Sequence, residues 1–159
     1  MKKFFISIYF IIIIFGFSYD VYSSDRFINK ESKILKILDD LGYKKISMQV
    51  IETKTLNEFT QLTNLPYSYY NGALLVIDGK KYIIITPFKY FDNLLDVRKT
   101  VNHEILHYYL TEKTDLTSYE QEGVILYLLN DFKNEEGYSE YRKMDYYEII
   151  NYIKTRELY

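Results

Sequence analysis

The sequence of 159 residues contains no cysteine and only two histidines. The absence of cysteine excludes disulfides, iron–sulfur clusters, cysteine-ligated zinc and a lipoprotein anchor on an N-terminal cysteine. The chain also has no excess of positive charge, because its 20 Lys and Arg residues face 22 Asp and Glu residues. A net charge of −2 disfavours a dedicated nucleic-acid-binding protein, so we expect no nucleic-acid partner.

The first residues have the composition of a Sec signal peptide. Two lysines precede a nearly unbroken apolar run from Phe4 to Phe17. This run is shorter than the roughly 20 residues needed to span a bilayer, so we expect cleavage, after Ser18 or Ser23. The protein would then be periplasmic or extracellular, and retention of the segment as a membrane tether is the alternative. We therefore divide the chain into a signal peptide (1–23) and one domain (24–159).

The remainder of the chain predicts a small α+β domain without internal repeats or linkers. Alternating side chains over 46–51 predict a strand, and β-branched runs around Asp78-Gly79 predict a hairpin of strands 73–77 and 82–86. Apolar residues at helical spacing predict helices over 29–41, 56–65, 94–110, 118–132 and 146–153. Strands that precede helices favour an antiparallel or mixed sheet over a parallel α/β sheet.

Both histidines belong to one pentapeptide, His103-Glu104-Ile105-Leu106-His107, inside the predicted helix 94–110. Positions i and i+4 share a helix face, so the two imidazoles can bind one metal ion. Glu104 projects about 100° away from His103, where it can act as a general base without being a ligand. HExxH also occurs by chance on solvated helices. The motif nevertheless uses every histidine in the chain, and its helix contains no Pro or Gly, so we interpret it as a metal site.

A catalytic zinc ion takes three protein ligands and leaves one position to water, so a third ligand is needed. The candidates are Asp115, Glu120 and Glu122. The short loop after Leu110 predicts an antiparallel helix pair that brings Glu122 to the height of His107. Glu122 also shares its helix face with apolar residues, where an unpaired carboxylate would be costly.

The other two candidates have simpler explanations. Glu120 points almost the opposite way and completes a capping box that starts at Thr117. Asp115 lies in the loop, where capping or solvation accounts for it. The sequence therefore predicts that His103, His107 and Glu122 are the metal ligands.

These residues carry a family resemblance. The HExxH motif, followed by Tyr119-Glu120-Gln121-Glu122-Gly123 and Tyr127, resembles the minimal peptidase MA metallopeptidases of the gluzincin group. In that group a second helix opens with a pattern like W-L-x-E-G, whose Glu is the third zinc ligand. Here Tyr119 stands in place of the Trp, and Glu120 in place of an apolar residue. The resemblance spans roughly Leu56 to Leu129 and implies a zincin-like domain of hairpin, active-site helix and third-ligand helix.

The resemblance implies a Zn²⁺-dependent peptidase that acts on a peptide or protein substrate, with Glu104 as the general base. The strand Ala73–Ile77 would bind an extended substrate along the edge of the sheet. A transition-state donor is expected among the tyrosines Tyr108, Tyr119, Tyr127, Tyr138 and Tyr141. The alternative hypothesis is an exported binding or structural protein whose metal site is degenerate or structural.

Overall fold

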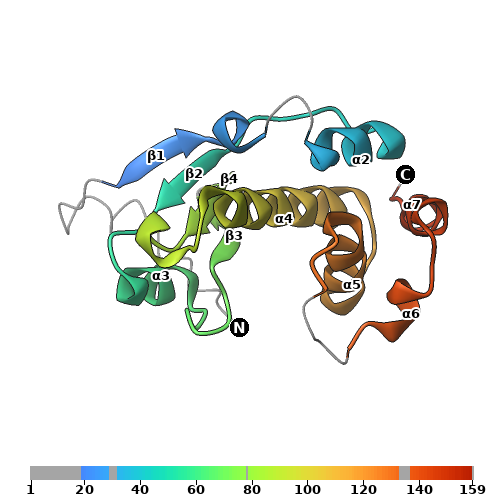
Figure 1. The fold of residues 1–159 in the computed structure, drawn as a ribbon. Helices are drawn as coiled ribbons and strands as arrows, with labels where there is room; N and C mark the ends of the chain where they lie inside the picture. The colour runs from blue at the N-terminus through green and yellow to red at the C-terminus, as the bar shows by residue number, and fades with distance from the viewer. Residues whose placement is uncertain (1–18, 29–31, 78, 133–136, 159) are drawn as a thin grey trace, which may run out of the picture.

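The computed structural model describes residues 19–28, 32–77, 79–132 and 137–158. Within these residues the chain forms six α-helices and one four-stranded sheet (Figure 1). The expected α+β class is confirmed. The apolar segment of the predicted signal peptide, Phe4 to Phe17, lies outside the described residues.

The sheet is mixed and has the strand order β1–β2–β4–β3. β1 (Asp20–Ser23) pairs antiparallel with β2 (Gln49–Glu52), and β2 pairs parallel with β4 (Lys80–Ile85). β3 (Gly72–Ile77) pairs antiparallel with β4, which confirms the expected hairpin. β3 is consequently an edge strand of the sheet.

Helices α3 and α4 cover opposite faces of the sheet. α3 (Leu56–Thr63) packs Phe59 against Ile84, whereas α4 (Leu94–Lys113) packs on the face that carries Ile83 and Ile85. This division follows from the alternation of side chains along a strand. β4, which lies inside the sheet between β2 and β3, is therefore covered by a helix on each face.

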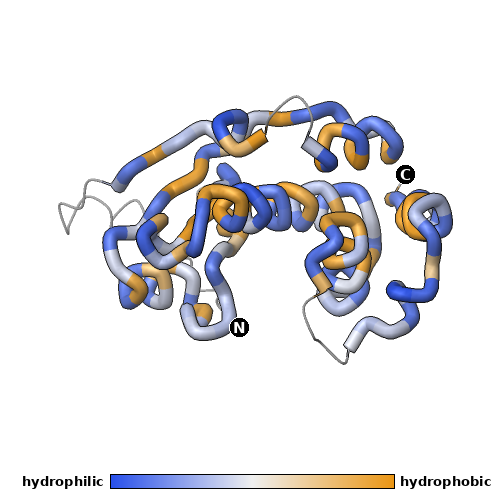
Figure 2. The backbone as a smooth tube through the Cα atoms, viewed as in Figure 1, coloured by the Kyte–Doolittle hydropathy of each residue, from blue (hydrophilic) through white to orange (hydrophobic). Residues whose placement is uncertain are grey.

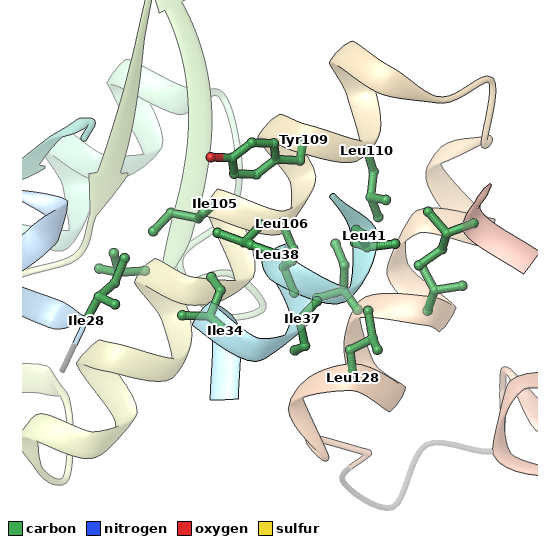
Figure 3. Packing of buried hydrophobic residues seen from close by; sticks show 14 of the residues in the cluster. Ile28, Ile34, Ile37, Leu38, Leu41, Ile105, Leu106, Tyr109, Leu110 and Leu128 are labelled. Atoms are coloured by element: carbon green, nitrogen blue, oxygen red, sulfur yellow. The ribbon is translucent and has the colours of Figure 1, made fainter. Parts of the chain in front are cut away.

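The larger core lies around α4. α2 (Lys33–Leu41), α5 (Ser118–Leu129) and α7 (Tyr146–Lys154) contribute hydrophobic side chains to it. The backbone tube in Figure 2 is orange at the hydrophobic residues of these helices. Figure 3 shows Ile34, Ile37, Leu38 and Leu41 of α2 close to Leu106 and Leu110 of α4 and Leu128 of α5. This packing fixes α5 relative to α4. No helix in the described part of the chain has the length and apolar character needed to cross a membrane.

Several expected boundaries are corrected by capping and side-chain bonds. β2 starts at Gln49 rather than Ile46, because the Ile46 and Met48 N–H groups donate to the Tyr109 hydroxyl and to Ser24 Oγ. α3 and α5 stop at Thr63 and Leu129, each before an asparagine in the left-handed conformation, Asn64 (φ 58°) and Asn130 (φ 56°). α4 extends to Lys113 instead of ending at Leu110.

The sequence did not predict four elements of the structure. These are the strand β1, the 3₁₀ turns η1 (Ser24–Phe27) and η2 (Phe88–Tyr90), and the short helix α6 (Ser139–Arg142).

A polar network ties the start of α5 to the C-terminal helix α7. The Glu120 carboxylate accepts the backbone N–H of Thr117 at 2.7 Å, the Tyr152 hydroxyl at 2.7 Å and Arg156 Nη1 at 3.1 Å. Arg156 Nε also donates to Asp115 at 2.6 Å. The hydrogen bonds from Thr117 and Tyr152 lower the pKa of the Glu120 carboxyl to about 2. The ionised carboxylate thus stabilises the first turn of α5.

We expect Glu120→Ala to lower the free energy of unfolding by about 1–2 kcal/mol at pH 7, because it removes one half of the capping box and the bond to Tyr152. The pKa of Glu120 is depressed in the folded state, from an ordinary value of 4.5 to about 2. Its stabilisation is therefore complete above pH 4.5 and is lost as the pH falls through about 2. Urea unfolding at pH 7 and pH 3 measures this. The difference in the free energy of unfolding between variant and wild type should be smaller at pH 3.

The exposed Glu140 of α6 provides a control. Glu140→Ala should change the free energy of unfolding by less than about 0.5 kcal/mol at either pH. An equal loss from both substitutions would show that the Glu120 network does not stabilise α5.

Candidate metal centre

His103, His107 and Glu122 each bring one ligand atom to a common point. His103 Nε2 lies 3.1 Å from His107 Nε2 and 3.3 Å from Glu122 Oε2, and His107 Nε2 lies 3.1 Å from the same Oε2. Ligands placed tetrahedrally at zinc–nitrogen distances would be separated by roughly 3.3 Å. Among the described residues, no other group of three His, Asp or Glu side chains comes close enough to hold an ion. The structure thus brings the three predicted residues close enough together to hold one metal ion.

The helix pair α4–α5 creates this convergence. The two histidines project from the same face of α4, with ring centroids 4.8 Å apart. α5 follows α4 after a short loop (Figure 1) and begins with the capping box of Thr117 and Glu120. The side chains of His103, His107 and Glu122 are 18%, 22% and 32% exposed. The ligand atoms therefore lie in a partly desolvated position that solvent can still reach.

The charges at the site stabilise an ionised Glu122. Burial by itself raises the pKa of the Glu122 carboxyl, but hydrogen bonds from both histidines outweigh it and hold the pKa below its usual range. Burial lowers the pKa of the His107 imidazole, yet the bond to Glu122 and the charge of Glu104 raise it overall. An ionised carboxylate beside two imidazoles is a suitable donor set for a divalent cation.

Glu104 lies beside this group without belonging to it. Its side chain is buried, with 8% of the residue exposed, and it accepts a hydrogen bond from the backbone N–H of Leu74 in β3. Burial raises the pKa of its carboxyl, the two histidines oppose that shift, and Glu122 adds to it. The carboxylate is thus held between the ligand histidines and the edge strand.

The close approach of β3 to Glu104 depends on Gly72. A Cβ atom at this position would lie 2.5 Å from Thr100 Cγ2 and 3.1 Å from Glu104 Oε1. Any larger residue must therefore displace the Thr100 and Glu104 side chains or separate β3 from α4.

The rejected candidates for the third ligand are engaged elsewhere. Asp115 accepts a hydrogen bond from Arg156, and Glu120 belongs to the capping network described above. Both outcomes agree with the choice of Glu122.

The five tyrosines considered as transition-state donors lie in different surroundings. Tyr119 stacks on Tyr138 with ring centroids 4.6 Å apart, and the Tyr141 ring covers Gly123, where an added Cβ would meet it at 2.3 Å. Gly123 thus lets α6 pack against α5 directly after Glu122. Tyr127 packs edge-on against Phe132, and Tyr108 lines a cavity of about 510 Å³ together with Lys81 and Glu112.

Gln121 is a polar residue of the site that the sequence analysis missed. It precedes Glu122, is buried with 8% exposed, and places Oε1 at 3.1 Å from His107 Nδ1. Its position one residue before Glu122 was the sequence signal that could have indicated a role at the site. The contact with His107 depends on the distance between two helices, which the sequence does not show.

No protein-family model, curated protein or solved structure matches the chain. The resemblance to the gluzincin metallopeptidases consequently rests on the HExxH motif and on Tyr119–Gly123. The chemistry of the site has to be inferred from its own residues.

We expect Gly72→Ala to lower the free energy of unfolding by about 1–2 kcal/mol, because its methyl group collides with Thr100 and Glu104. The double variant Gly72→Ala/Thr100→Ser removes the Cγ2 atom that lies nearest and should recover part of this loss. Urea unfolding of both variants provides the measurement.

Gly137 offers a matched control, since a Cβ there meets nothing within 4 Å. Gly137→Ala should remain within about 0.5 kcal/mol of wild type. If Gly72→Ala were equally harmless, the close contact between β3 and α4 would not constrain Glu104.

Proposed function

We propose that the chain is a zinc-dependent peptidase with His103, His107 and Glu122 as metal ligands and Glu104 as general base. The observation that carries this proposal is the mutual separation of 3.1–3.3 Å between the three ligand atoms, which fits tetrahedral zinc. Two imidazoles and one carboxylate are also the ligand set of several catalytic zinc sites. When bound, zinc would acidify a water molecule and polarise a peptide carbonyl.

Three protein ligands favour a catalytic site over a structural one. Structural zinc sites are usually closed by four protein ligands, whereas catalytic sites keep one position for water or substrate. In the described part of the chain the ligand group contains three residues. Glu104 lies nearby, but its carboxylate is not one of the ligands. The alternative of a purely structural metal site leaves this buried carboxylate without a purpose.

Glu104 has the environment expected of a proton acceptor. Burial raises the pKa of its carboxyl and makes it a stronger base than an exposed glutamate, although the nearby histidines oppose this shift. The Leu74 N–H favours the ionised carboxylate, which is the form that can accept a proton. In the proposed mechanism Glu104 takes a proton from the attacking water and then delivers it to the leaving amine.

The edge strand β3 supports a peptide or protein substrate. An extended peptide can pair with the free side of an edge strand through main-chain hydrogen bonds. β3 begins at Gly72, beside Glu104, and its Val76 side chain is 59% exposed. A substrate strand that paired with β3 would therefore pass the proposed base.

We also propose that the protein is exported through its Sec signal and acts as a periplasmic or extracellular enzyme. The pairing of β1 (Asp20–Ser23) with β2 favours cleavage after Ser18 over cleavage after Ser23, which would remove this strand. A retained apolar segment would instead tether the enzyme to a membrane.

We expect Glu104→Gln to lower the rate of peptide hydrolysis by about 10²–10⁴-fold while zinc stays near one ion per chain, because it removes the base and spares the ligands. His103→Ala should lose both zinc and hydrolysis, because two ligands remain. Metal content is measured by mass spectrometry of the desalted protein, and hydrolysis with a library of fluorescence-quenched peptides.

Glu112, on the same helix and 45% exposed at its side chain, provides the control. Glu112→Gln should keep zinc and activity at wild-type levels. Full activity of Glu104→Gln would exclude the general-base role, and zinc retained by His103→Ala would exclude the proposed ligand set.

A further inference from the structure

Gln121 is the buried polar side chain that contacts a proposed ligand. Its amide bridges three partners from different parts of the helix pair. Nε2 donates to the Leu116 carbonyl at 3.0 Å, and Oε1 lies 3.1 Å from His107 Nδ1 and 3.3 Å from Thr111 Oγ1. It therefore connects the loop, α4 and α5 at the residue that precedes Glu122.

The carbonyl of Leu116 determines the orientation of the Gln121 amide. A backbone carbonyl oxygen only accepts hydrogen bonds, so the NH₂ group of Gln121 has to face it. The amide oxygen then faces His107 and Thr111. A reversed amide would place two oxygens against each other at Leu116 and is excluded by this network.

The orientation of the amide in turn selects the tautomer of His107. An amide oxygen only accepts, so the His107 Nδ1 that faces it carries the proton. When a metal ion replaces the proton that Nε2 shares with Glu122, Nε2 can give its lone pair to the ion while Nδ1 keeps its own proton. This is the atom that lies 3.1 Å from both His103 Nε2 and Glu122 Oε2.

We propose that Gln121 is a positioning residue that holds His107 in the Nδ1-protonated tautomer and so presents Nε2 to the metal ion. This inference rests on the metal site of the proposed function. Residues that hydrogen-bond a ligand histidine fix its ring and typically change metal affinity 10- to 100-fold when they are replaced. Gln121 reaches this position through the register of α5, since its backbone N–H donates to Thr117 at the helix start.

Two substitutions separate the effect on His107 from a general effect on helix packing. Gln121→Met has similar length and removes both the acceptor for His107 and the donor to Leu116. Gln121→Glu keeps an acceptor for His107 and removes only the donor. We expect Gln121→Met to weaken zinc affinity by about 10- to 100-fold, and Gln121→Glu to stay within about fivefold of wild type although it is less stable. Competition with a chromophoric chelator measures the affinity, and urea unfolding measures the stability.

The hydrogen bond itself can be read from ¹H–¹⁵N NMR of the zinc-loaded protein, in which an imidazole bound through Nε2 carries its proton on Nδ1. With only two histidines in the chain, two Nδ1–H signals are expected, and contacts to neighbouring protons assign them. We expect the His107 Nδ1–H proton to lie downfield and to exchange slowly with water in wild type and in Gln121→Glu, and to move upfield and exchange faster in Gln121→Met. Thr111→Val, which removes only the hydroxyl from the same amide oxygen, serves as the control and should leave this signal unchanged.

Three results would overturn the inference: wild-type zinc affinity in folded Gln121→Met, equal losses of affinity in Gln121→Met and Gln121→Glu, or a His107 Nδ1–H proton that exchanges as fast in zinc-loaded wild type as in Gln121→Met. A folded wild-type protein that binds no zinc would instead overturn the proposed function. Each of the first three results requires a wild-type protein that binds zinc, so the two failures are distinguishable.

Discussion

The packing of α5 against α4 is the constraint on which the whole site depends. Two ligand atoms come from one helix and are placed by its own geometry, but the third comes from a second helix. Buried residues of both helices, Leu106 and Leu110 on α4 and Ile125 and Leu128 on α5, belong to the same core. A core packed at the density of an organic crystal resists small shifts between its helices. This rigidity keeps Glu122 Oε2 within 3.3 Å of both histidines.

Contacts from several other elements support this helix pair. The network of Glu120, Tyr152 and Arg156 fixes the start of α5, and the Tyr141 ring packs on Gly123 directly after the ligand. β3 approaches α4 closely at Gly72, beside Glu104. Gln121 joins the two helices through His107. Each of these contacts restrains a residue next to the site, and together they preorganise the ligands before an ion binds.

The parts of the site predicted from the sequence were those governed by short-range rules. The i, i+4 spacing of His103 and His107 dictates a shared face on any helix. Glu122 was accessible to the same reasoning, because a short loop and a capping box fix where α5 begins. The hairpin around Gly79 was also predictable, since its turn signal is local.

The parts that the sequence left unpredicted depend on long-range contacts. β1 exists because it pairs with β2, and β2 starts late because a tyrosine on α4, Tyr109, binds the backbone of Ile46. The role of Gln121 requires the distance between two helices, and the restriction at Gly72 requires the separation of β3 and α4. None of these partners is adjacent in sequence, so no local pattern indicates them.

X-ray absorption spectroscopy of the zinc-loaded protein tests the central claim most directly, because it reports the ligand atoms around the ion. The account predicts four light-atom ligands, with two imidazoles and a carboxylate oxygen at about 2.0–2.1 Å and a water oxygen in the fourth position. A first shell of oxygen atoms without imidazole scattering would contradict it. So would folded protein that retains no zinc at all.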